Sequence, residues 1–215
     1  MMQPGSRVES SDLRFLGKTM VLRKEKGKLY WLGENPASDA VITRGVAGGG
    51  TQILLITRAK DGKLALVGGF IEAKRFNDKD GGELKTANAE LDEETLLVDK
   101  DGNKISFVES DKTHQGRQLV KDPRNDEISY ITTSVFHKHF PAEEGDQLKF
   151  RPLTEAEKLK PEFNEDTKPA WYELVSIDGN ISVKSSTGEI VALKDLYASH
   201  GDILDNLIKT GQIEI

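Results

Sequence analysis

Three glutamates within one short stretch have the spacing of a metal site. Glu90, Glu93 and Glu94 stand at i, i+3 and i+4, so on a helix their carboxylates share one face. Like charges at this spacing repel each other, and the C-terminal half of a helix disfavours negative charge further. A hard divalent cation such as Mg²⁺ offsets this repulsion, because it binds oxygen ligands and accepts several carboxylates. The spacing indicates a cation site, with a solvated acidic helix face as the alternative interpretation.

The surrounding residues predict an amphipathic helix that follows a strand and a glycine turn. Leu84, Ala87 and Leu91 lie on the opposite face of the helix and can pack on a core. Residues 63–67 predict a short strand, and Gly68–Gly69 follow it directly. Glycines at a strand end allow close approach to the backbone, so a ligand or metal could reach main-chain carbonyls. The order strand, glycine turn, loop and acidic helix is typical of a site for phosphate and metal.

This order resembles the Nudix box, whose pattern is G-x5-E-x7-R-E-U-x-E-E-x-G-U with U an aliphatic residue. The chain supplies the glycine turn from Gly68 to Glu72. It also supplies the E-U-x-E-E core from Glu90 to Glu94, and Leu97 closes the match.

The sequence departs from the Nudix pattern in three places. Ala89 stands where the family has arginine, and Leu96 stands where it has glycine. The loop at residues 73–82 is longer than the pattern allows, so neither Glu72 nor Glu83 has the standard spacing of the upstream glutamate. The family's arginine orients a catalytic glutamate, so a substitute cation is expected from the candidates Lys74, Arg75 and Lys85.

Three further stretches sharpen the resemblance. In chain order around the box they are Gly33–Arg44, Asp122–Asn125 and Leu196–His200. Together they look like the mitochondrial-type ADP-ribose pyrophosphatases and the related ADP-ribose-sensing domain of a melastatin-type cation channel. The resemblance runs from about Phe15 to the C-terminus.

The resemblance implies a set of substrate-binding residues. Residues matching Asp122 and Arg124 contact ADP-ribose in the family, and an aspartate and an arginine fixed by proline could grip ribose hydroxyls and a phosphate. A plain turn is the alternative. Residues matching Tyr197 and His200 line the nucleotide site, where a tyrosine ring suits stacking on adenine. Packing at a helix end is the alternative. Arg44 ends a motif segment and is expected to pair with a phosphate.

Composition narrows the class of partner. Charged residues make up 31% of the chain and the net charge is −6, which argues against a nucleic-acid partner. An acidic enzyme acting on an anionic diphosphate must neutralise it locally, which calls for Mg²⁺ or Mn²⁺. The absence of cysteine excludes disulfides and thiol chemistry. No apolar run has the length of a signal peptide or a membrane span, so we expect no membrane partner and a cytoplasmic protein.

We expect an α/β protein with a single domain over residues 13–215, after a disordered stretch at residues 1–12. The Nudix resemblance implies a mixed, curved β-sheet sandwiched between helices, with a small N-terminal β extension that includes a hairpin at residues 18–32. Other predicted elements are strands at 52–57, 128–137 and 170–177, and a last helix at 203–209 that is N-capped by Asp202 and closed by Gly211.

The expected function is hydrolysis of the pyrophosphate bond of ADP-ribose to AMP and ribose 5-phosphate. Glu90, Glu93 and Glu94 would hold the metal with help from the Gly69 carbonyl, and one glutamate or a nearby acid would take a proton from water. Two alternatives stay open. One is a module that binds or senses ADP-ribose with little turnover, which Ala89 favours. The other is a pyrophosphatase for another nucleoside diphosphate derivative, such as NADH or a sugar nucleotide.

Overall fold

A mixed β-sheet is the main element of the computed structural model, which describes residues 14–15, 18–22, 29–79, 81–160, 163 and 167–215. The expected disordered stretch at residues 1–12 lies outside the described residues. The sheet has the strand order β14-β13-β12-β5-β4-β10-β9, with β3 and β7 also paired to β4 and β6 paired to β5. Its strands are β3 (Val21–Leu22), β4 (Trp31–Gly45), β5 (Thr51–Thr57), β6 (Leu64–Ala65), β7 (Val67–Phe70), β9 (Lys112–Leu119), β10 (Ser129–Phe140), β12 (Lys168–Ile177), β13 (Asn180–Lys184) and β14 (Ile190–Ala192).

The sheet is mixed because one central pair of strands is parallel. β4 and β10 run parallel from Gly33 opposite Ser129 to Arg44 opposite Phe140. β5 and β7 are antiparallel to β4, and β12 is antiparallel to β5. The prediction of a turn at Gly68–Gly69 was wrong, because both glycines lie within β7 and pair with Asp39 and Ser38 of β4. This pairing brings the two glycines beside the middle of β4.

Smaller elements complete the chain. β1 (Arg14–Phe15) and β2 (Lys18–Thr19) form a two-stranded sheet, and with β3 they make the expected N-terminal β extension. β8 (Leu97–Val98) pairs with β11 (Lys149–Phe150). The helices are α1 (Glu83–Thr95), α2 (Ala142–Gly145) and α3 (His200–Lys209), and short 3-10 turns are η1 (Ala73–Arg75), η2 (Glu109–Asp111) and η3 (Leu193–Asp195).

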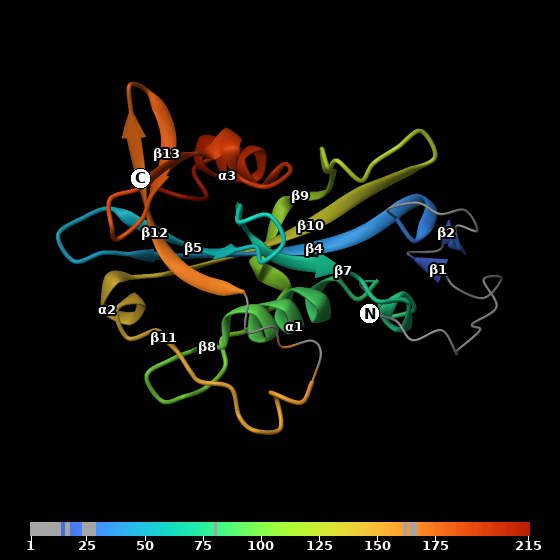
Figure 1. Cartoon of the computed structure of the whole chain (residues 1–215), viewed down its shortest axis with the longest axis horizontal. Coiled ribbons are helices and arrows are strands. Elements are labelled where there is room, and N and C mark those ends of the chain that lie inside the picture. The colour runs from blue at the N-terminus through green and yellow to red at the C-terminus, as the bar shows by residue number, and fades with distance from the viewer. Residues whose placement is uncertain (1–13, 16–17, 23–28, 80, 161–162, 164–166) are drawn as a thin grey trace.

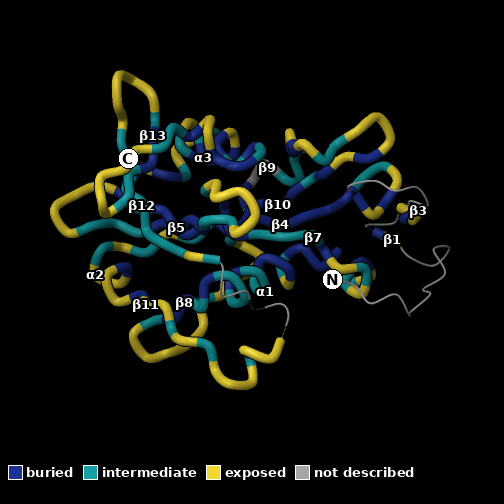
Figure 2. The backbone as a smooth tube through the Cα atoms, in the orientation of Figure 1, coloured by how far each residue is buried: buried dark blue, intermediate teal, exposed yellow. Residues whose placement is uncertain are grey.

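Helices cover both faces of the sheet, as expected for this fold class. In Figure 1 the sheet is seen nearly edge-on, with α1 on one side and α3 on the other. Alternation along the central strands supplies both layers, because successive side chains point to opposite faces. Ile42 packs in the cluster that contains Leu91 of α1, whereas its neighbour Val41 packs in the cluster that contains Leu204 and Leu207 of α3. The buried central strands are dark blue in Figure 2.

The last helix begins earlier than predicted. It starts at His200 with Ser199 as the N-cap residue, so the assignment of Asp202 as N-cap was wrong. The chain turns at Ala198, which has a φ of 50°, and the His200 ring accepts a hydrogen bond from the Leu66 backbone N–H at 2.8 Å. This contact fixes the first turn at His200, upstream of the residue whose type suggested a cap. Gly211 follows the helix with a φ of 73°, as expected.

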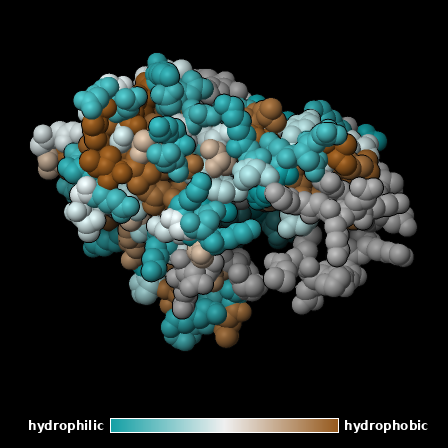
Figure 3. All heavy atoms as spheres, turned by 45° about the horizontal axis from the view of Figure 1, so that its top comes forward, coloured by the Kyte–Doolittle hydropathy of each residue, from teal (hydrophilic) through white to brown (hydrophobic). Residues whose placement is uncertain are grey.

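Hydrophilic residues cover much of the face shown in Figure 3, with apolar residues gathered mainly over the C-terminal strands. Ile177 and Ile190, on β12 and β14, are among the exposed large apolar side chains. Within the described ranges, no helix has the length and apolar character needed to cross a membrane.

Candidate active site

Helix α1 presents Glu90 and Glu94 to the two glycines of β7, Gly68 and Gly69. Ala87 and Leu91 are fully buried against the sheet, as the sequence pattern predicts. Glu90 and Glu94 are partly buried beside β7, and the backbone N–H of Gly68 donates to Oε2 of Glu94 at 3.2 Å. The helix therefore packs on the sheet by its apolar face and places two carboxylates beside the short strand β7.

The two glycines of β7 are required by space. Neither takes a positive φ, so backbone freedom does not explain them. A Cβ on Gly69 would overlap the carboxylate of Glu90, and a Cβ on Gly68 would overlap Oδ1 of Asp39 and lie 2.6 Å from the Ser38 carbonyl oxygen. The absence of side chains lets carboxylates from α1 and β4 approach one strand from two sides.

These carboxyl groups have strongly shifted acidities. Burial raises the pKa of Glu90 to about 7, with repulsion from Glu93 as the next cause. Burial also raises the pKa of Glu94 to about 8, with repulsion from Glu90 as the next cause. The pKa of Asp39 is raised by burial as well, and its charge contributes to both glutamate shifts. The cluster therefore favours a bound proton or a bound cation over free charge.

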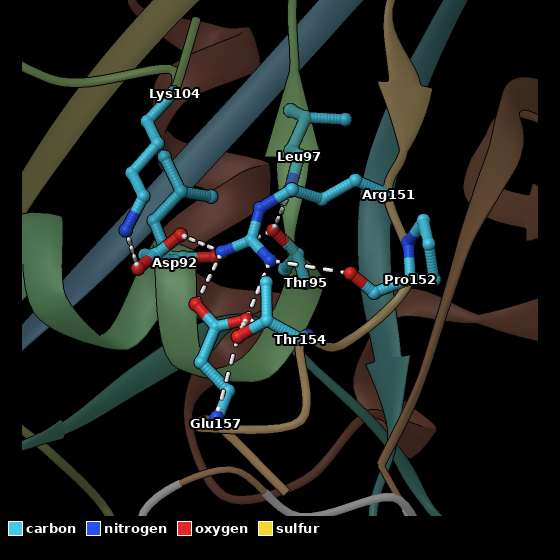
Figure 4. A network of polar contacts seen from close by, with 9 residues as sticks. Asp92, Thr95, Leu97, Lys104, Arg151, Pro152, Thr154 and Glu157 are labelled. Atoms are coloured by element: carbon cyan, nitrogen blue, oxygen red, sulfur yellow. Dashed lines mark hydrogen bonds and ion pairs between the residues drawn. The ribbon is translucent and has the colours of Figure 1, made fainter. Parts of the chain in front are cut away.

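Two ion-pair networks fix the position of α1. On the side away from the glycines, Asp92 accepts hydrogen bonds from Nζ of Lys104 at 2.6 Å and from Nη2 of Arg151 at 3.2 Å (Figure 4). Arg151 also donates to both carboxylate oxygens of Glu157 at 2.8 Å. This network ties the segment after β11 to the helix.

The start of α1 is held by a buried carboxylate. Glu83 is 1% exposed and forms ion pairs with Lys112 and with Nε of Arg117 at 3.3 Å, both from β9. Arg117 reaches on to Glu34 of β4 at 2.8 Å. Since a buried charge without a partner is costly, this network specifies where the helix begins.

A cavity of about 290 Å³ opens beside Glu94. One wall is acidic and carries Asp39 and Glu94 next to Gly68 and Gly69 of β7. Cations also line the cavity, and an apolar part is made by side chains from β4, β7 and β10. The cations are Arg58, Lys60 and Arg124, and the apolar residues include Ala37, Phe70 and Ile131. The cavity thus offers both the charges that a metal–phosphate group needs and a surface for an apolar ring.

Four of the five substrate-binding residues that the sequence suggests lie on this cavity: Asp122, Arg124, Tyr197 and His200. Arg124 donates from Nε and Nη2 to the two carboxylate oxygens of Asp122 at 2.7 and 2.8 Å. The Tyr197 hydroxyl donates to the same carboxylate at 3.2 Å. The Asp122 side chain is therefore already hydrogen-bonded on both oxygens, and it positions Arg124 and Tyr197.

The hydrogen bond that His200 accepts defines the tautomer of its neutral ring. Its Nδ1 accepts the Leu66 N–H, so the neutral ring carries its proton on Nε2, which lies 4.0 Å from Oδ1 of Asp39. Burial lowers the pKa of His200, although Asp39 opposes this shift. His200 therefore presents a neutral N–H donor on the acidic side of the cavity.

Arg44 lies elsewhere, contrary to expectation. Its guanidinium donates to Oε1 of Gln52 and to the Gly145 carbonyl, and it stacks on the Trp171 ring at 4.2 Å from the centroid. It is not among the residues that line the cavity. Arg44 lies one residue before the end of β4, where it contacts Gly145 of α2, so its position in the motif segment did not place it at the site.

Solved structures share this architecture. A MutT/nudix family protein from Enterococcus faecalis superposes with a TM-score of 0.53 at 17% sequence identity, over 88% of this chain and 65% of that protein. The chain has the Nudix fold. It spans about two thirds, 65%, of the length of that relative.

Weaker Nudix-fold similarity extends to two other kinds of protein. The NUDIX domain of Shewanella oneidensis NrtR, solved with ADP ribose, gives a TM-score of 0.41 at 13% identity, over 83% of this chain and 88% of that one. An Ap4A hydrolase from C. elegans gives 0.35 at 13% identity, over 65% and 80%. No protein-family model matches the sequence, and no curated protein matches it.

The structure shows where the three candidate substitute cations lie. Arg75 donates to the Thr86 hydroxyl at 3.0 Å and lies 3.2 Å from Glu72, and its charge lowers the pKa of Glu90. Of the three candidate cations, the other two have partners on the outside: Lys74 pairs with Glu72, and Lys85 pairs with Asp78. Arg75 is therefore the cation placed to act on the glutamates.

Leu96 ends α1 in a backbone conformation that favours glycine. It ends α1 with a φ of 54° and a ψ of 31°, in the left-handed region, and its N–H donates to the Asp92 carbonyl. A non-glycine residue in this conformation costs about 1–3 kcal/mol. The helix therefore ends at Leu96 in the conformation that glycine would adopt without this cost.

A divalent metal fits the chemistry of the donors, although no ready-made cage is present. Within the described residues, no three His, Asp or Glu side chains are arranged as a metal-binding group. Burial raises the pKa of both Glu90 and Glu94, and repulsion from Glu90 raises that of Glu94 further. Binding of Mg²⁺ would replace their protons and relieve this repulsion, with Glu93 and the Gly69 carbonyl as further candidate ligands.

Sequence analysis missed two residues of the site. Asp39 lies inside the segment Gly33–Arg44, but nothing in its local pattern distinguishes it from its neighbours. Arg58 follows β5 directly, and a basic residue at a strand end is unremarkable on its own. Both enter the site through contacts with distant parts of the chain.

Proposed function

We propose that the protein is a metal-dependent pyrophosphatase that hydrolyses the diphosphate bond of ADP-ribose to AMP and ribose 5-phosphate. The observation that carries this proposal is the cavity. It is lined by Glu94 and the two glycines of β7, and also by Asp122, Arg124, Tyr197 and His200. The Nudix fold supports the chemistry, and the choice of ADP-ribose rests on the sequence resemblance.

In this proposal the residues divide the work by their charge. Glu90, Glu93 and Glu94 would hold Mg²⁺, which would act as a Lewis acid toward the phosphoryl oxygens and lower the pKa of water. The Nε2–H of His200 donates a hydrogen bond to a substrate oxygen. Arg124 forms an ion pair with a phosphate or hydrogen bonds with the nucleoside. A carboxylate of the acidic wall accepts the proton of the attacking water.

We expect purified protein to release AMP and ribose 5-phosphate from ADP-ribose in equal amounts with Mg²⁺ present. Excess chelator should abolish turnover and added Mg²⁺ should restore it, with product chromatography as the measurement. Unchanged turnover in chelator would remove the metal from the proposal. Cleavage of only NADH or a sugar nucleotide would reassign the substrate, and ADP-ribose binding without cleavage would identify a sensing module.

Arg75→Ala is expected to lower kcat for ADP-ribose by about tenfold or more, because the loss of one charge-assisted hydrogen bond is worth about 1.5–3 kcal/mol. Lys85→Ala removes an equal charge from the start of the same helix. Its amine pairs with Asp78 and its side chain is 67% exposed, so we expect kcat to change less than about twofold, as for an exposed ion pair. If the two variants lose activity equally, Arg75 has no special role in orienting Glu90.

A further inference from the structure

The aromatic face that the sequence suggests for adenine is already occupied. The guanidinium of Arg58 lies over the Tyr197 ring with Cζ 3.5 Å from the centroid. The His200 ring approaches Tyr197 edge-on, with the ring centroids 5.7 Å apart. A base could stack on this face of Tyr197 only by displacing Arg58.

The contacts of Arg58 hold its guanidinium in one orientation. Nε lies 3.3 Å from Oδ1 of Asp61, within the loop that follows β5, and the side chain is 27% exposed. Stacking fixes the plane of the guanidinium, and the contact to Asp61 fixes its rotation within that plane. The N–H groups on the two terminal nitrogens remain at the edge of the stack, which is the edge that binds phosphate bidentately.

Arg58 also lies close to the acidic wall. Its positive charge lowers the pKa of both Glu94 and His200, which places it within electrostatic reach of the two. It lines the same cavity as Glu94, with Lys60 and Arg124 as the other cations. A phosphate held by a metal at Glu94 would therefore meet Arg58 across the cavity.

We propose that Arg58 binds the diphosphate of the substrate and that Tyr197 positions it by stacking. The proposal rests on the proposed function for the identity of the ligand, but the anion site itself does not depend on turnover. Tyr197 then serves the phosphate end of the substrate rather than its base. The substrate class is any nucleoside diphosphate derivative whose diphosphate can lie between Glu94 and Arg58.

Calorimetric titration in excess chelator tests this assignment without turnover. The probes are ADP-ribose, inorganic pyrophosphate and adenosine, which lacks a phosphate. Arg58→Gln should weaken ADP-ribose and pyrophosphate binding by about tenfold or more, the scale of a charge-assisted hydrogen bond, and leave adenosine affinity within about twofold. Arg58→Lys keeps the charge without the planar fork and should weaken binding less than Arg58→Gln does.

Lys63→Gln is the matched control, because Lys63 is an exposed cation in the same loop and does not line the cavity. It should leave all three affinities within about twofold, since an exposed charge away from the ligand contributes little. Melting temperatures check that each variant is folded. An equal loss in Lys63→Gln would reduce the effect to overall charge and overturn the assignment.

The adenosine arm separates the two possible roles of Arg58. If Arg58→Gln weakens adenosine as much as ADP-ribose, Arg58 supports the base and the phosphate assignment is wrong. If wild type binds pyrophosphate but not ADP-ribose, the proposed function fails while the effect of Arg58→Gln on pyrophosphate still decides the anion site. If wild type binds neither, or if Arg58→Gln changes neither, the inference is overturned.

Discussion

Glu94→Gln is expected to make the metal-free protein more stable at alkaline pH and to abolish most of its activity. Burial and the charge of Glu90 raise the folded-state pKa of Glu94 to about 8, from the ordinary value of 4.5. A carboxyl whose pKa is raised in the folded state stabilises the fold below its unfolded pKa, and this stabilisation is lost as the pH rises through the folded pKa. The loss is on the order of a few kcal/mol for a shift of this size. Glutamine cannot ionise, so the variant should escape it.

Unfolding by denaturant in excess chelator, measured from about pH 5 to about pH 9, checks this expectation against the window set by the two pKa values. Wild type should lose stability across the window, and Glu94→Gln should show a flatter profile. Added Mg²⁺ should stabilise wild type more than the variant at alkaline pH, because only the folded wild type offers the full ligand set. Turnover of ADP-ribose should fall by at least about a hundredfold in the variant.

Glu155→Gln is the control for the loss of a negative charge, because the Glu155 side chain is 90% exposed. Its stability profile and turnover should match those of wild type. If Glu94→Gln keeps the pH profile of wild type, the Glu94 carboxyl is not strained by burial. Near-normal turnover in Glu94→Gln would show that this carboxylate does not hold the metal.

Local patterns were sufficient to predict the orientation of the acidic helix and the layers of the sheet. The spacing of Glu90, Glu93 and Glu94 specifies a shared helical face, and the apolar residues Ala87 and Leu91 specify which way that face points. Alternation in the central strands specifies a sheet with both faces covered, and the structure has one. These features depend on residues a few positions apart, so the sequence alone carries them.

The remaining features depend on contacts between distant segments. Arg58 meets Tyr197 only because the loop after β5 reaches the turn before α3. Arg44 was expected at the site because it ends a motif segment, but the structure places it against Trp171 and Gln52. Register and crossover connections decide between such residues, and neither is written in the local pattern.

The same substitution at the two adjacent glycines of β7 should have different effects: Gly68→Ala should lower stability, and Gly69→Ala should lower activity. Gly68→Ala adds a Cβ against the Asp39 carboxylate, 2.6 Å from the Ser38 carbonyl oxygen and 3.0 Å from the Asp39 Cα. Those backbone atoms belong to β4, which is paired with β7 with Asp39 opposite Gly68, so they cannot move aside without breaking the sheet. We expect Gly68→Ala to lower the free energy of unfolding by about 1–3 kcal/mol or more, the cost of overpacking a core.

Gly69→Ala should fold but fail as an enzyme. The three atoms nearest to its added Cβ all belong to the carboxylate of Glu90, which a change of side-chain rotamer can move away. The backbone of Gly69 has no positive φ, so alanine adds no conformational strain. The displaced Glu90 could no longer share a cation with Glu94, and we expect turnover to fall by about a hundredfold with the melting temperature of the metal-free protein nearly unchanged. Stabilisation by Mg²⁺ should disappear in Gly69→Ala, and this separates a lost metal ligand from a damaged fold. Full activity in Gly69→Ala would show that the position of Glu90 against β7 does not matter for catalysis.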